Sequence, residues 1–150
     1  MQILRSKPDD AATLTEIAFA AKRHWGYPEN WICRWADVLT VTPGYIQSHP
    51  TFVALVDGKL VGFYALRFQT AEAQLDHLWV LPSSMRGGIG RTLFEHAERT
   101  AREAGAVNLK VESDPHAEGF YRRMGAVVYG QQAAPMDGQA RFLPLLQKGL

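Results

Sequence analysis

A cluster of glycine and arginine residues has the composition of an anion-binding turn, and it comprises Arg86, Gly87, Gly88, Gly90 and Arg91. It follows an apolar run typical of a strand and precedes a segment with helical spacing. Because glycine has no Cβ, such a turn can adopt positive φ and direct several backbone N–H groups at one anion. A helix that opens at Ile89 or Gly90 adds unpaired N–H groups and the positive end of its dipole. The stretch therefore predicts a site for the phosphate groups of a ligand.

The neighbouring residues narrow the choice of ligand. A nucleoside-triphosphate loop needs Lys followed by Ser or Thr after its last glycine, whereas this chain has Gly90-Arg91-Thr92. A dinucleotide fingerprint needs a further glycine three residues after Gly90, and that position is Leu93. What remains is a pyrophosphate held without a dedicated metal, beside basic side chains. Coenzyme A fits that description.

Two blocks of sequence carry a family resemblance. The stretch from Val80-Leu81-Pro82 through Met85-Arg86-Gly87-Gly88-Ile89-Gly90 resembles the acetyl-CoA loop of the GNAT superfamily of N-acetyltransferases. The block from Asp114 to Ala126, with Phe120-Tyr121 and Gly125, is similar to the second family motif, and Arg141 to Leu145 is similar to the ending of many bacterial members. Two departures stand out: Met85 replaces a polar residue and Asp114 replaces the common Asn.

The resemblance implies a GNAT fold and acetyl-CoA as the acyl donor. It implies that Tyr121 protonates the departing thiolate. The residues it assigns to the cofactor are Leu78, Trp79, Val80, Met85, Arg86, Gly87, Gly88, Ile89, Gly90, Arg91, Asp114, Ala117, Phe120 and Tyr121.

The acceptor amine needs a proton acceptor. An amine of pKa about 10.4 is mostly protonated at neutral pH, and forming its reactive neutral form costs about 4.6 kcal/mol. Alternation along the strand expected at 74–81 places Gln74, Asp76, Leu78 and Val80 on one face and Leu75, His77, Trp79 and Leu81 on the other. The resemblance implies that Asp76 and Gln74 point toward the amine. We expect Asp76 to act as base or as anchor for the ammonium group, with His77 as second choice if a bulge re-aims it.

An aromatic segment lies where the resemblance places the acceptor lid. Trp25, Tyr27 and Trp31 are candidates to bind the acceptor together with Gln74 and Asp76, using ring faces for an apolar, aromatic or cationic amine. Core packing is an equal interpretation for Trp25 and Trp35. Arg67 and Tyr64 could reach the same cleft.

The pattern predicts an α/β domain over residues 1–150, with a mixed, mostly antiparallel central sheet flanked by helices. We expect strands at 2–5, 52–56, 60–68, 74–81, 107–111, 126–129 and 141–146, and helices from Pro8 to Trp25, from Trp31 to Leu39, from Gly90 to Gly105 and between Asp114 and Gly125. Asp57-Gly58 is typical of a hairpin turn.

Composition argues against a protein that binds nucleic acid or an anionic membrane, that depends on disulfides, or that binds a metal. The formal net charge is +1, with 16 basic and 15 acidic residues, which favours neither nucleic acid nor an anionic membrane surface. The one cysteine, Cys33, excludes an internal disulfide and is expected to be a small buried hydrophobe. No histidine shows metal-ligand spacing, so no metal is expected. The polar N-terminus and the lack of a long apolar run favour a cytoplasmic protein.

The sequence thus predicts an acyltransferase that moves an acetyl group from acetyl-CoA to a primary amine by direct attack in a ternary complex. The acceptor, a small molecule or a peptide amine, stays open, as does a longer acyl donor. The alternative is a non-catalytic acyl-CoA-binding sensor or regulatory module. A homodimer is plausible by resemblance, through strands near the C-terminus.

Overall fold

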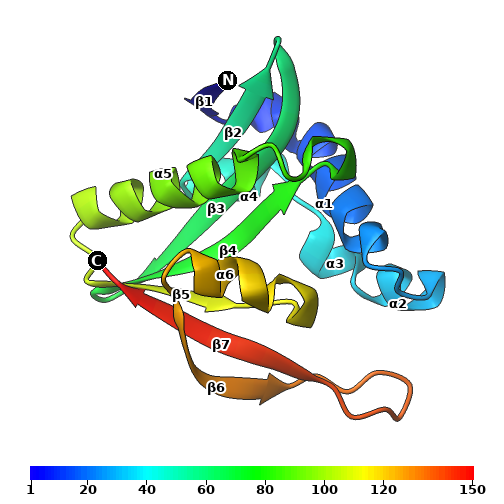
Figure 1. Ribbon diagram of the computed structural model, residues 1–150. Helices are drawn as coiled ribbons and strands as arrows, with labels where there is room; N and C mark the ends of the chain where they lie inside the picture. The colour runs from blue at the N-terminus through cyan, green and yellow to red at the C-terminus, as the bar shows by residue number, and fades with distance from the viewer.

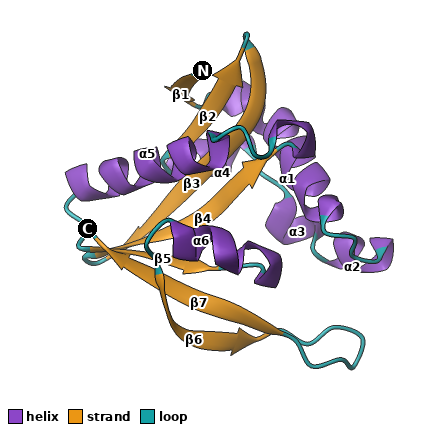
Figure 2. Cartoon of the chain, in the orientation of Figure 1, coloured by secondary structure: helices purple, strands orange, loops and turns teal.

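The computed structural model describes residues 1–150 and has a seven-stranded sheet in the order β1-β2-β3-β4-β5-β7-β6. Every neighbouring pair is antiparallel except β4 and β5. The mixed, mostly antiparallel sheet predicted from the sequence is confirmed (Figure 2). The strands are β1 (Gln2–Arg5), β2 (Thr51–Val56), β3 (Lys59–Gln69), β4 (Glu72–Val80), β5 (Asn108–Glu112), β6 (Val127–Ala133) and β7 (Phe142–Gly149).

Helices cover both faces of the sheet, and each face has its own apolar core. They are α1 (Ala11–His24), α2 (Glu29–Arg34), α3 (Ala36–Leu39), α4 (Pro43–Ser48), α5 (Ile89–Glu103) and α6 (Glu118–Arg123). Helices α5 and α6 pack on one face around Leu93, Phe94 and Tyr121, whereas α1 and α4 pack on the other around Leu14, Ile46 and Phe63 (Figure 1). Burial of these two apolar surfaces stabilises the arrangement.

The two neighbouring strands β4 and β5 run parallel and separate after a short pairing. Their register covers only Glu72 to Gln74 against Asn108 to Lys110. Beyond Gln74, β4 continues to Val80 beside β3, while β5 continues beside β7. The opening between the two strands points toward the start of α5 and the turn before α6, which come directly after them in the chain.

A β-bulge at Asp76 changes which side chains share a face of β4. Ala65 pairs with His77 but Leu66 pairs with Leu75, so Asp76 has no opposite residue on β3. Leu75 therefore shares the α5 face with Leu78 and Val80, whereas His77 contacts Phe63 in the core beside α1. The strict alternation expected from the sequence is wrong at this point because of the extra residue.

Other expectations need smaller corrections. The helix expected over 31–39 is two helices, α2 and α3, which meet at Trp35. Helix α4 was missed, although Thr42 caps it by accepting a hydrogen bond from Tyr45 and Pro43 opens it. Cys33 is exposed, not buried, because Ile32 takes the inward position of α2. None of the helices combines the length and the apolar character that a membrane-crossing segment requires.

Candidate functional site

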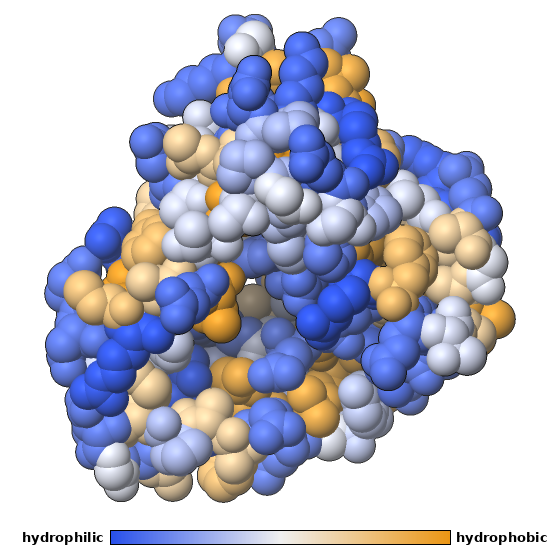
Figure 3. Space-filling model, turned by 180° about the vertical axis from the view of Figure 1, so that it is seen from behind, coloured by the Kyte–Doolittle hydropathy of each residue, from blue (hydrophilic) through white to orange (hydrophobic).

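A cavity of about 600 Å³ opens where β4 and β5 separate. Residues of α1, β4, the turn before α5, the loop after β5 and α6 line it. In the view from behind, the surface is hollowed near its centre, and both hydrophobic and hydrophilic residues border the hollow (Figure 3). All the residues assigned to the cofactor line this cavity except Gly87 and Ile89, and so do Asp76 and His77.

The turn before α5 presents its backbone N–H groups to this cavity. Thr92 donates to the carbonyl of Gly88, and the N–H groups of residues 86–91 have no partner in the chain. The turn does adopt positive φ, as its glycines allow, at Gly88 (φ +81°) and also at the non-glycine residue Arg86 (φ +68°). Gly90 leaves room for the ring of Phe120, because a Cβ at this position would lie 3.2 Å from Cε1 of that ring. Consecutive N–H groups without partners at the start of a 15-residue helix are the kind of arrangement that can bind a phosphate group.

Tyr121 lies against the apolar core on the α5 side of the cavity. Its side chain is buried, and its ring packs near Phe94 and Phe120 with centroids 6.0 and 5.1 Å away. Burial raises the pKa of the Tyr121 hydroxyl, and the negative charge of Asp114 raises it further. Tyr121 therefore keeps its proton at neutral pH and can only donate it.

Asp76 reaches the cavity from the bulge in β4. Its carboxylate accepts a hydrogen bond from the hydroxyl of Tyr45 on α4, and Nη2 of Arg67 lies 3.9 Å from its Oδ1. The side chain is 25% exposed, so it remains accessible from the cavity. Burial raises the pKa of Tyr45, and the hydrogen bond to Asp76 adds to the rise, which keeps Tyr45 a donor. Because the Tyr45 hydroxyl stays neutral, it holds the Asp76 carboxylate in place without neutralising its negative charge.

His77 is 8% exposed and lines the same cavity. The indole N–H of Trp79 donates to its Nδ1 over 3.0 Å. An indole nitrogen is a donor only, so Nδ1 must be the acceptor and the proton of the neutral ring must be on Nε2. Burial lowers the pKa of His77, and His49 lowers it further, while Asp76 opposes the shift.

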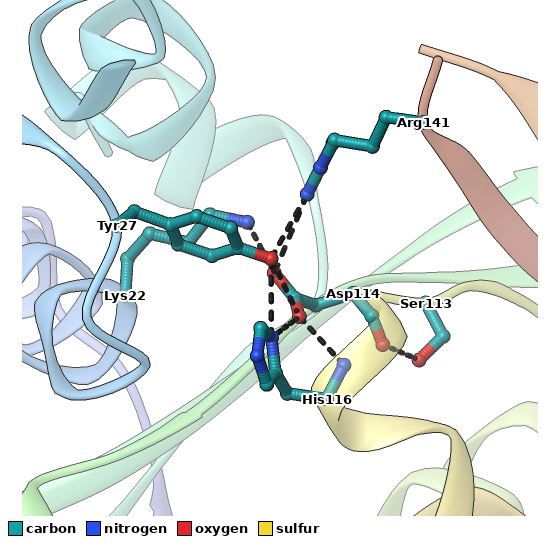
Figure 4. A network of polar contacts seen from close by, with 6 residues as sticks. All are labelled: Lys22, Tyr27, Ser113, Asp114, His116 and Arg141. Carbon is teal, nitrogen blue, oxygen red and sulfur yellow. Dashed lines mark hydrogen bonds and ion pairs between the residues drawn. The ribbon is translucent and has the colours of Figure 1, made fainter. Parts of the chain in front are cut away.

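A second set of polar residues lies beside α1 around Asp114, which lines the cavity together with His116 (Figure 4). Nζ of Lys22 lies 2.6 Å from Oδ2 of Asp114, and the hydroxyl of Tyr27 donates to the same oxygen over 3.0 Å. Arg141 lies 3.7 Å from this oxygen and donates to the hydroxyl of Tyr27 over 3.1 Å. The backbone N–H of His116 donates to Oδ1 over 2.8 Å. We call these five residues the Asp114 cluster.

The three charged side chains of the Asp114 cluster are largely held out of water, which makes their ion pairs interdependent, whereas His116 is exposed. The side chains of Asp114, Lys22 and Arg141 are 7%, 11% and 12% exposed. Burial lowers the pKa of Lys22 although Asp114 opposes this. Burial alone would raise the pKa of Asp114, but the charge and hydrogen bonds of Lys22 and His116 outweigh it and hold that pKa below its usual value. One buried carboxylate thus compensates two cations.

The residues expected to bind the acceptor are only partly brought together. Trp25 lines the cavity, and its ring stacks on that of His116 with centroids 5.1 Å apart. Tyr27 belongs to the Asp114 cluster, and Trp31 donates to Asp137 over 2.5 Å outside the cavity. Gln74 lies in a separate hollow with Glu72 and Lys110.

Tyr64 and Arg67, both on β3, differ in whether they reach the cavity. Tyr64 does not reach the cavity, because its hydroxyl bonds to His96 and Thr100 on α5. Arg67 does approach the site, through Asp76.

Sequence reasoning missed three residues that shape the site. Tyr45 could have been found from Thr42-Pro43, which is a helix-start signal that places Tyr45 in the first turn. Lys22 had only its position on α1, one residue after the cavity-lining Ala21. Arg141 was noted only as part of a C-terminal motif, and its contact with Asp114 depends on a fold that brings β7 beside β5.

Known proteins resemble the chain in sequence and in fold. Streptothricin acetyltransferase of Streptomyces lavendulae is 38% identical over 96 residues, which cover 60% of this chain and 51% of that protein. The peptidyl-lysine N-acetyltransferase YjaB of Salmonella typhimurium is 32% identical over 112 residues, 74% of this chain and 72% of that protein. The chain therefore spans about half the length of the streptothricin acetyltransferase, and 72% of the length of YjaB.

A solved structure shows the same fold. The PaiA N-acetyltransferase of Thermoplasma acidophilum, solved in complex with coenzyme A, superposes with a TM-score of 0.76 at 22% identity. The superposition covers 99% of this chain and 98% of that one. The model of the acetyltransferase (GNAT) family matches residues 13–126, which is most of the chain. The chain belongs to the GNAT family of acetyltransferases.

Proposed function

We propose that this protein transfers an acetyl group from acetyl-CoA to a primary amine by direct attack within a ternary complex. The observation that carries the proposal is one cavity with two chemically different ends. One end has the unpaired N–H groups of residues 86–91, and the other has the accessible carboxylate of Asp76. Two substrates can therefore meet in this cavity from opposite faces of the sheet.

The residues of the turn fit coenzyme A. Six consecutive N–H groups without a partner in the chain suit a pyrophosphate, and Arg86 and Arg91 add positive charge at the same end of the cavity. The apolar side chains of Leu78, Val80 and Phe120 line the part that would hold the pantetheine arm. When bound, acetyl-CoA supplies the acetyl group as a thioester. The solved structure of the same fold holds coenzyme A, which supports this choice of ligand.

Asp76 binds the acceptor ammonium and accepts its proton, directly or through water. An ordinary carboxylate is a weak base near neutral pH, and positioning has to compensate for this. The hydrogen bond from Tyr45 fixes the carboxylate without neutralising it. As the carbon–nitrogen bond forms and the carbon–sulfur bond breaks, Tyr121 donates its proton or a hydrogen bond to the sulfur, and the nitrogen loses its second proton to water.

The proposal is tested by measuring thiol release from acetyl-CoA with a panel of amines, for the wild type and for Asp76→Asn and Tyr121→Phe. We expect turnover with at least one amine and slower turnover for both variants. Saturable acetyl-CoA binding with no turnover on any amine would contradict the proposal and favour a sensor module. CoA thioesters of increasing acyl length, compared with the best amine, test whether acetyl is the preferred group.

The names of the relatives suggest where the panel should begin. One is named for streptothricin and one for peptidyl-lysine, so the panel should include amine antibiotics and lysine peptides. A homodimer is proposed through β6 and β7, where Val127, Tyr129 and Phe142 are exposed. Light scattering of the purified protein measures its mass and tests this directly.

A further inference from the structure

The bulge at Asp76 places two consecutive side chains on the same side of β4. In a regular strand they would point to opposite faces. Here Asp76 accepts a hydrogen bond from the Tyr45 hydroxyl, and the ring of His77 lies 5.5 Å from the ring of the same tyrosine. An anion and an imidazole are thus adjacent at the end of the cavity that holds Asp76, which we call the acceptor end.

The imidazole of His77 offers this cavity a donor. Trp79 occupies Nδ1, and Nε2 has no hydrogen-bond partner in the chain. Every fully buried polar side-chain atom does have a partner, so Nε2 is not among the fully buried atoms. His77 lines the cavity, and Nε2–H is its one ring N–H group without a partner in the chain. A side chain that is more than nine-tenths buried thus keeps one polar group for a ligand.

We infer that the acceptor is an amine with a hydrogen-bond-accepting oxygen beside it, such as an α-amino carbonyl compound, with Asp76 facing the ammonium group and Nε2–H of His77 facing the oxygen. The inference rests on the proposed acetyl transfer. It makes His77 a donor and not a base, and it makes Trp79 a positioning residue that fixes the tautomer. An amine without the oxygen would leave the buried donor without a partner.

Matched amines test the inference. Glycinamide is compared with propylamine, and phenylalaninamide with 1-phenylbutan-2-amine, because each pair differs by replacement of the carboxamide with an ethyl group. The measured quantity is the ratio of kcat/KM within a pair, for the wild type, His77→Leu and His77→Gln. Comparison of this ratio between proteins cancels the intrinsic reactivity of each amine. Gln retains an N–H donor and is the control for loss of the imidazole.

We expect His77→Leu to lower the ratio by about 3- to 10-fold, the effect of one neutral hydrogen bond, and His77→Gln to restore most of it. An unchanged ratio in His77→Leu would overturn the inference, and so would turnover confined to amines that lack the oxygen. No turnover of any amine would count against the proposed acetyl transfer itself, so the two failures are distinguishable.

The role of Trp79 has a separate readout. Imidazole NMR of the wild type should show His77 as the Nε2–H tautomer. Trp79→Phe removes the indole N–H that points at Nδ1 of His77. Because that N–H opposes protonation of Nδ1, the pKa of His77 should rise in the variant. Asp76, His49 and Tyr45 still surround the ring. His96 on α5 is the internal control and should titrate as before. An Nδ1–H tautomer, or a pKa unmoved by Trp79→Phe, would overturn this assignment.

Discussion

The two ends of the cavity offer different kinds of groups to a ligand. At the start of α5, the groups available are backbone N–H groups from one continuous segment of six residues. Away from this turn, the groups are side chains from distant parts of the chain: Trp25 from the end of α1, Asp76 and His77 from β4, and the Asp114 cluster. A backbone cradle depends little on any one side chain, whereas a side-chain network depends on each member. Substitutions should therefore affect the two ends very differently.

The largest effect is expected in the Asp114 cluster. Asp114→Ala leaves Lys22 and Arg141 buried without their carboxylate, and removal of one partner of a buried ion pair costs about 3–5 kcal/mol of unfolding free energy. Denaturant unfolding measures the loss. The control is Glu29→Ala, which removes the partner of Arg23 in an exposed ion pair and should change stability little. Equal losses in both variants would show that burial of the cluster does not make its carboxylate more important for stability than an exposed one.

The next largest effect concerns Asp76. Asp76→Asn keeps an oxygen for the Tyr45 hydroxyl but removes the charge and the proton acceptor, so kcat/KM for the amine should fall by about 10²- to 10³-fold. The affinity for coenzyme A should stay the same, because the other end of the cavity holds it. Steady-state kinetics and calorimetry measure the two quantities. Asp37→Asn, an exposed position on α3, serves as the matched control, and full activity of Asp76→Asn would remove the base from the proposal.

This contrast also explains what the sequence could predict. The turn at 86–91 and the helix after it were predictable because their signals are contiguous: glycines, arginines and the apolar spacing of α5. The hairpin at Asp57-Gly58 was predictable for the same reason, and both residues have positive φ. The bulge at Asp76 was not predictable in its position, because it depends on how β4 aligns with β3. The partners of Asp114 lie 92 residues before it at Lys22 and near the C-terminus at Arg141, and no local pattern connects them.

A smaller effect is expected at Tyr121, where the cofactor end depends on a side chain. Tyr121→Phe keeps the ring in its buried position but removes the donor to the sulfur, so kcat should fall by about 10²-fold. KM for acetyl-CoA should change little, because the proposal assigns cofactor binding mainly to the backbone N–H groups of residues 86–91. Thiol-release kinetics separate the two constants. A rise in KM without a fall in kcat would assign Tyr121 to binding and weaken its role as a donor.

The pH dependence of stability distinguishes the ends further. Burial lowers the pKa of His77 in the folded protein, so the unfolded chain takes up a proton first as the pH falls below about 6.5. The free energy of unfolding therefore decreases toward acid. His77→Gln removes this titration, and the decrease between about pH 7 and pH 5 should become shallower. Urea unfolding at several pH values measures it. An equal slope in both proteins would mean that His77 titrates alike in the folded and unfolded states.

The smallest effects are expected from the two arginines of the turn. Arg86→Ala and Arg91→Ala should each weaken coenzyme A binding by no more than about fivefold, because exposed ion pairs contribute up to about 1 kcal/mol. Arg86 also has φ +68°, a conformation that favours glycine, so Arg86→Gly removes the same charge while relieving the backbone. Its affinity should equal or exceed that of Arg86→Ala. Calorimetry measures all three, with Arg102→Ala in the last turn of α5 as the control. A loss of about 100-fold from either arginine would mean that side chains and not backbone N–H groups hold the pyrophosphate, and the two ends of the cavity would then be alike.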